Sequence, residues 1–127
     1  MKNHEEALDL LNLARDDYKS LQALVEMDLV THVVFFLAQQ TVEKSMKAVL
    51  ALNSVVYPKI HDLVRIAVML KDNGVEVPID ENSLKILNPF AADCRYGLPE
   101  VEFPDARKVF QIAKSTIEWC ELIAKEV

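Results

Sequence analysis

Apolar residues recur every three or four positions along most of the chain, the spacing that places them on one face of an α-helix. The pattern predicts three long helices, over about residues 3–27, 29–52 and 104–126. Two shorter helices are expected over about residues 60–73 and 81–92. Only 2 of the 127 residues are glycine, which leaves little of the turn material that a β-sandwich or barrel requires. We therefore expect the whole chain to form one all-α domain, an up-and-down antiparallel bundle of four main helices plus a short helix.

Residues that commonly begin or end helices divide these segments. Asp28 is expected to cap the second helix, and the link before it is short enough to make the first two helices pack antiparallel. Gly74 is expected to end the third helix, and Asp80 to cap the fourth. Pro89 should kink or split the fourth helix, because proline cannot donate the backbone hydrogen bond there. Pro104 suits the first position of the last helix.

The second predicted helix is apolar nearly all round, yet it carries a polar stripe formed by Gln39, Gln40, Glu43, Lys44 and Lys47. The last four of these fall at positions i, i+3, i+4 and i+7, which puts them on one side of a helix. Charge in or near a core is costly unless it is paired. The stripe therefore needs a partner, which is another helix, a second subunit or a ligand.

Composition and charge narrow the classes of function. The formal net charge of −6 argues against a protein that coats nucleic acid non-specifically, although it leaves room for a small basic site. Cys94 and Cys120 fit no metal-ligand spacing, and we expect no metal and no cofactor. No apolar run approaches the ~20 residues that span a bilayer. We expect a cytoplasmic protein that makes no membrane contact.

Four segments, in their order along the chain, carry a resemblance to a known family. They are Gln39-Gln40-x-x-Glu43-Lys44-x-x-Lys47-Ala48, Pro58-Lys59-Ile60-His61-Asp62-Leu63, Arg95-Tyr96 and Pro104-Asp105-Ala106. Together with the helix order they resemble the HEPN domain family (higher eukaryotes and prokaryotes nucleotide-binding). The resemblance implies a helical bundle that is usually a homodimer. It also implies a possible role beside a small nucleotidyltransferase partner, as in toxin–antitoxin-like systems.

Other members of this family are metal-independent endoribonucleases that carry an Arg-x(4-6)-His motif. None of the arginines in this chain is followed by a histidine at that distance. Glu100 and Glu102 stand where the histidine would follow Arg95, and two acids there would repel a phosphodiester. The chain therefore resembles a variant of the family that lacks the nuclease motif, and we name no catalytic residue.

Five residues are candidates for binding a nucleotide or another anion: Lys44, Lys47, His61, Arg95 and Tyr96. His61 is either a phosphate, base or acid–base contact, or a capping and packing residue at the start of its helix. Arg95 and Tyr96 either bind an anion with a guanidinium fork and a stacked ring, or form a salt bridge and seal the core.

Two functions of different class follow. The first is a homodimeric binding module for a nucleotide-like or RNA ligand, or for a nucleotidyltransferase partner. The alternative is a metal-independent endoribonuclease that uses Arg95, Tyr96 and His61 as a variant site.

Overall fold

The computed structural model describes residues 2–91 and 102–126, and this part of the chain is helical with no strand. The helices are α1 (Lys2–Glu26), α2 (His32–Leu52), α3 (Leu63–Asp72), α4 (Glu81–Leu87), the 3₁₀ turn η1 (Asn88–Phe90) and α5 (Ala106–Lys125). The prediction of an all-α bundle is confirmed. None of the described helices combines the length and the hydrophobicity that crossing a bilayer requires.

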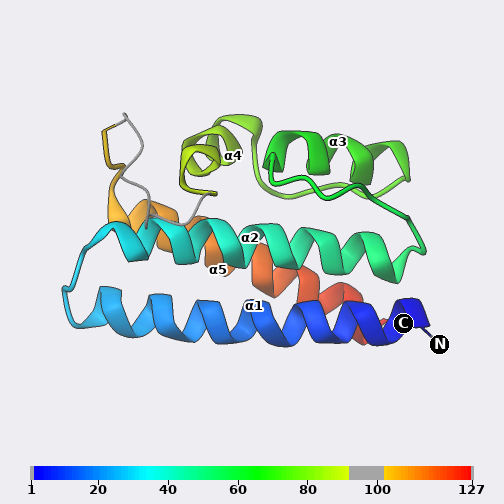
Figure 1. Ribbon diagram of the computed structural model, residues 1–127, viewed down its shortest axis with the longest axis horizontal. Helices are drawn as coiled ribbons and strands as arrows, with labels where there is room; N and C mark the ends of the chain where they lie inside the picture. Colours follow the sequence, from blue (N-terminus) through cyan, green and yellow to red (C-terminus); the bar gives the residue numbers. More distant parts are fainter. Residues whose placement is uncertain (1, 92–101, 127) are drawn as a thin grey trace.

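Helix α2 lies at the centre of the bundle (Figure 1). It packs against α1 on one side and against α3, α4 and η1 on the other, while α5 contacts both α1 and α2. α1 runs in the opposite direction to α2 and α5, and both ends of the chain lie at the end of the bundle opposite the α1–α2 link (Figure 1). Because neighbours surround it, α2 is buried on almost every face, as its nearly continuous apolar sequence predicts.

An aromatic cluster holds η1 and the segment before α5 against α2. The ring of Phe35 lies 5.3 Å from that of Phe90 and 4.9 Å from that of Phe103, with which it is nearly parallel. Phe35 and Phe90 are fully buried, whereas Phe103 is half exposed. Such aromatic contacts stabilise beyond the area that they bury, so three segments distant in sequence are fixed at this end of α2.

The boundary between α1 and α2 differs from the prediction. α2 begins at His32, not near residue 29, and its N-cap is Thr31, whose hydroxyl accepts a hydrogen bond from the backbone N–H of Val33. Asp28 instead has a left-handed backbone (φ 58°) just beyond the end of α1. The backbone N–H of Leu29 there donates to the carbonyl of Leu24, the pattern of a Schellman ending. The prediction that Asp28 caps α2 was wrong because an aspartate also tolerates this left-handed position.

The third helix begins later than the sequence pattern predicted. α3 starts at Leu63, and its N-cap is Asp62, whose carboxylate accepts hydrogen bonds from the backbone N–H groups of Val64 and Arg65. The helix ends at Asp72, and Gly74 follows with φ 80°, which confirms its expected role as the stop.

The last two helices follow their predicted signals closely. α4 ends at Leu87, and the chain tightens into η1 where Pro89 lies, so the predicted split is confirmed. Asp80 occupies the N-cap position of α4, but its carboxylate accepts from the Ser83 hydroxyl and not from a backbone N–H. α5 begins at Ala106, two residues after the predicted Pro104, because Asp105 supplies the cap.

Candidate functional site

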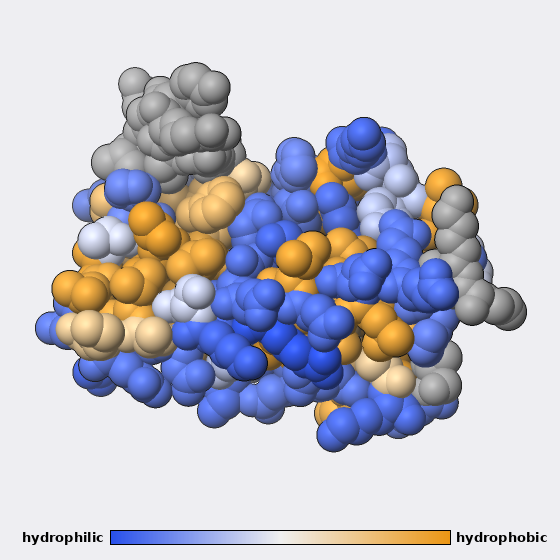
Figure 2. Space-filling view, turned by 60° about the horizontal axis from the view of Figure 1, so that its bottom comes forward, coloured by the Kyte–Doolittle hydropathy of each residue, from blue (hydrophilic) through white to orange (hydrophobic). Residues whose placement is uncertain are grey.

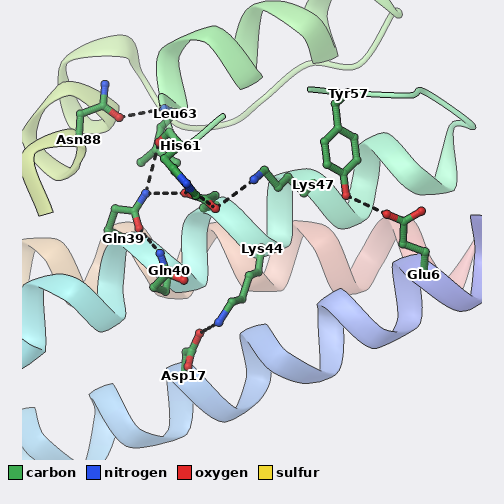
Figure 3. A network of polar contacts seen from close by, with 11 residues as sticks. Glu6, Asp17, Gln39, Gln40, Lys44, Lys47, Tyr57, His61, Leu63 and Asn88 are labelled. Carbon is green, nitrogen blue, oxygen red and sulfur yellow. Dashed lines mark hydrogen bonds and ion pairs between the residues drawn. The ribbon is translucent and has the colours of Figure 1, made fainter. Parts of the chain in front are cut away.

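The carboxylate of Glu43, in the middle of α2, is the hub of a polar network. Figure 3 labels the three residues that contact it, Gln39, Lys47 and His61. Its Oε1 accepts a hydrogen bond from Gln39 Nε2 at 2.9 Å, and its Oε2 pairs with Lys47 Nζ at 3.1 Å. His61 Nδ1 lies 3.1 Å from both carboxylate oxygens. Gln39, Glu43, Lys47 and His61 are called the Glu43 network below.

The sequence builds this network from one helix and one link. Gln39, Glu43 and Lys47 stand four residues apart, so they form a single row along α2. His61 comes from the link between α2 and α3, and its carbonyl accepts from Gln39 Nε2 at 3.4 Å. The row on α2 therefore holds both the ring and the backbone of His61.

The start of α3 is closed by its own side chains. Asn88 Oδ1, from η1, accepts from the backbone N–H of Leu63 at 2.8 Å, and Asn88 Nδ2 donates to Asp62 Oδ1 at 2.9 Å (Figure 3). The Asp62 carboxylate also accepts hydrogen bonds from the backbone N–H groups of Val64 and Arg65. The N-terminal amides of α3 are therefore satisfied, and His61 is not the cap. Asn88 was missed in the sequence because only the tertiary fold brings η1 to this point.

Lys47 is held from a second direction by Tyr57, another residue of the α2–α3 link. The ammonium nitrogen lies 5.7 Å from the centre of the Tyr57 ring, within the range of a cation–π contact. The Tyr57 hydroxyl donates to Glu6 Oε1 of α1 at 3.2 Å (Figure 3). Burial and the nearby Glu6 carboxylate raise the pKa of Tyr57 to about 12, so its hydroxyl keeps its proton.

The rest of the stripe pairs elsewhere within the same chain. Lys44 Nζ lies 2.6 Å from Asp17 Oδ2 of α1, and Gln40 Nε2 donates to Gln39 Oε1 at 2.7 Å. The partner that the stripe required is therefore the chain's own fold, through α1 and the α2–α3 link. Two of the candidate anion contacts, Lys44 and Lys47, already face carboxylates and point to different neighbours.

Two opposing effects set the charge of Glu43. Burial is the largest and acts to raise the pKa of this carboxyl, because it disfavours the charged form. The hydrogen bonds from Gln39, Lys47 and His61 together act more strongly in the other direction and leave the pKa below its ordinary value. Glu43 is therefore a carboxylate at neutral pH, and it accepts hydrogen bonds from all three partners.

His61 is the exposed member of the network. Its side chain is 65% exposed, whereas that of Glu43 is 6% exposed. Nδ1 faces the buried carboxylate, and Nε2 has no hydrogen-bond partner among residues 2–91 and 102–126. A buried carboxylate behind an exposed imidazole fixes the ring and its tautomer, an arrangement that serves binding or proton transfer.

The other candidates fall outside this description. Arg95 and Tyr96 lie outside the described residues, as does Glu100, whereas Glu102 is described and exposed. Within residues 2–91 and 102–126, no three His, Cys, Asp or Glu side chains are grouped as a metal site needs.

The two segments that meet in the Glu43 network, 39–48 and 58–63, are two of those on which the family resemblance rests. The family model for the HEPN domain matches residues 7–123. The chain belongs to the HEPN domain family. No curated protein and no solved structure matches it. Membership makes this chain a helical module of a nucleotide- or RNA-related kind, and the HEPN segments on α2 and before α3 join at the contact between Glu43 and His61.

Proposed function

We propose that this HEPN domain is a homodimeric binding module, and that it binds a nucleotide-like ligand on the face that presents His61. The observation that carries the proposal is the contrast within one contact: a buried carboxylate, Glu43, holds an exposed imidazole in a fixed orientation. An imidazole that only filled space would not need a buried charge behind it. The exposed edge of an imidazole can contact the oxygen atoms of a phosphate or the edge of a nucleotide base.

Positive charge for an anionic ligand comes from outside the network. Lys44 and Lys47 are engaged with Asp17 and Glu43, so they are poorly placed to meet a phosphate. The exposed Lys59 and Arg65 flank His61 in the sequence and can add charge near it. Two exposed cations close to His61 in the sequence suit a small phosphorylated ligand better than a long nucleic acid, because the chain as a whole is acidic.

The nucleotide can arrive free or on a protein. A small nucleotidyltransferase of a toxin–antitoxin-like pair is the partner that we propose would deliver it. Titration of the domain with free nucleotide, and separately with such an enzyme with and without its nucleotide, separates the two sources.

The proposed homodimer rests on an apolar patch at the α1–α2 end. Met27, Leu29, Val30 and Val33 are between 40% and 67% exposed. Hydrophobic side chains gather on this end of the bundle in Figure 2. The residues that follow on α2, Val34 and Phe35, belong to the protomer's own core. Large exposed apolar patches commonly mark interfaces.

Sedimentation velocity tests the dimer. We expect the wild type to sediment above its 14.4 kDa monomer mass at micromolar concentration, and Val30→Glu to sediment as a monomer with unchanged helicity. A control change at the exposed Leu122 of α5, Leu122→Glu, should leave the dimer intact. A monomeric wild type would remove this part of the proposal.

The contact between His61 and Glu43 is also the observation that favours the alternative endoribonuclease. An oriented imidazole can take a proton from a 2′-hydroxyl, but cleavage also needs a cation that holds the charge developing on phosphate. We expect no cleavage, because the chain lacks the Arg-x(4-6)-His motif and Lys44 and Lys47 on α2 are already paired with carboxylates.

The decisive binding experiment uses nucleotides and matched histidine variants. We expect ADP to bind the wild type in calorimetry, His61→Ala to lose at least tenfold in affinity, and His4→Ala to bind normally, because His4 is exposed on α1 outside the Glu43 network. Metal-free cleavage of a structured RNA by the wild type, abolished by His61→Ala, would replace this proposal with the endoribonuclease.

A further inference from the structure

We infer that ligand binding at His61 takes up one proton, and that Glu43 is the positioning residue which directs that proton to Nε2. The inference rests on the proposed function, because it concerns how the same face engages a phosphate.

The geometry fixes which ring nitrogen can change its protonation. Nδ1 lies at 3.1 Å from each oxygen of Glu43, so the two acceptors share one N–H between them. Those oxygens also accept hydrogen bonds from Gln39 Nε2 and Lys47 Nζ, and in these two contacts both nitrogen atoms act as donors. A carboxylate that accepts from all its neighbours has no proton to give back, so Nδ1 stays protonated. The neutral ring therefore carries its lone pair on Nε2, at the exposed edge.

A lone pair at the exposed edge is the wrong partner for a phosphate. Phosphate oxygens at neutral pH are mostly acceptors, and two acceptors facing each other repel. Contact at hydrogen-bond distance therefore requires Nε2–H, and the ring must become an imidazolium. In the complex this cation lies between two anions, Glu43 behind it and the ligand in front, which favours the charged form.

The charges around the ring come from several elements. Glu43 favours the imidazolium from α2, and Lys47 on the same helix opposes it. Asp62, next in sequence, adds negative charge, although its carboxylate is engaged in the cap of α3 and with the neutral Asn88 of η1. The exposed Lys59 and Arg65 oppose protonation.

The remaining neighbour is Tyr57 in the same link. It stays neutral and connects Lys47 to the Glu6 carboxylate of α1. The incoming phosphate adds negative charge at the exposed edge of the ring, and this charge favours uptake of a proton there.

Calorimetry with ADP tests directly whether ligand binding is coupled to protonation of His61. Titrations at about pH 6, 7 and 8, in two buffers that differ in ionisation enthalpy, count the protons that accompany binding. We expect an uptake that rises toward one proton as the pH increases, and an affinity that then falls about tenfold per pH unit. Adenosine, which lacks the phosphates, should show no uptake.

Two variants separate positioning from simple structure. Glu43→Gln should weaken ADP binding and flatten its pH dependence, while Gln40→Ala, which alters a neighbour of the network without touching His61, should keep both. A nitrogen-15 spectrum of the wild-type imidazole at about pH 8 tests the tautomer without any substitution. We expect a protonated Nδ1 and a bare Nε2.

The outcomes distinguish this inference from the proposed function. ADP binding with no proton uptake at any pH, or a ring protonated at Nε2 before the ligand is added, overturns the inference and leaves the binding module standing. Absence of ADP binding to the wild type across the whole pH range overturns both.

Discussion

Replacement of Glu43 by glutamine should destabilise the fold strongly, although the change is nearly isosteric. The Glu43 side chain is 6% exposed, and its carboxylate accepts hydrogen bonds from three donors, one of which is the ammonium of Lys47. Glutamine keeps one acceptor oxygen but places an amide N–H₂ where the second oxygen stood. Lys47, itself only 9% exposed, then faces a neutral group and loses the charge that offsets its burial.

The magnitude follows from what is left unpaired. Breaking a buried ion pair by removing one partner costs about 3–5 kcal/mol. Because glutamine preserves volume and one hydrogen bond, we expect the lower end, about 3 kcal/mol. For a domain of this length that corresponds to a fall of roughly 10 °C in Tm. A loss of that size is a large part of the stability of a typical domain.

Urea unfolding followed by circular dichroism measures this loss, with an unchanged slope showing that the unfolded state is comparable. The matched control is Glu121→Gln, which removes the carboxylate from a half-exposed salt bridge with Arg15 at 2.8 Å. We expect that control to cost less than about 1 kcal/mol. Equal effects of the two substitutions would refute the reasoning, because burial of the charge would then have no special consequence.

Three further outcomes are expected from the same structure. Because the pKa of Glu43 is lowered in the folded protein, its contribution to stability is present above its ordinary pKa of 4.5 and is lost as the pH falls through the folded value. When the free energy of unfolding is measured against pH, the wild type should therefore lose more stability between neutral pH and about pH 3 than Glu43→Gln does. Ser45→Ala should raise the free energy of unfolding by about 0.5–1 kcal/mol in urea titration, since the buried Ser45 hydroxyl has no hydrogen-bond partner among the described residues and alanine favours a helix; a loss of stability would show that the hydroxyl is satisfied. Burial raises the pKa of the Cys120 thiol to about 12, so in a Cys94→Ser variant a thiol reagent at about pH 8 should label Cys120 only after unfolding, and fast labelling of the native protein would contradict its burial.

The helical periodicity was enough to predict the fold class, because the apolar stripes of the long helices are continuous. The ends of the helices were harder to predict where several polar residues compete to cap them. Asp28, Thr31 and Asp62 all have the chemistry of an N-cap, and only the path of the chain decides which of them caps a helix and which ends one.

Some contacts of the candidate site could be predicted from the sequence and others could not, for a similar reason. The pairing of Gln39 and Lys47 with Glu43 follows from a spacing of four residues on one helix, which the sequence shows directly. The contacts of Asp17 with Lys44 and of His61 with Glu43 join residues far apart in the chain. No feature of the neighbouring sequence indicates these contacts, so the partner of the polar stripe could be identified only from the arrangement of the helices.

The central position of α2 limits the substitutions that this sequence can tolerate. Seven consecutive residues of α2, from Ser45 to Ala51, are buried, whereas α5 buries only one face. In a library of all single substitutions, tolerance along α5 should rise and fall with the helical turn. Along the second half of α2 it should stay uniformly low, with no period at all. Variation in this protein is therefore expected to accumulate on the outer helices, around a central one whose sequence is nearly fixed by its neighbours.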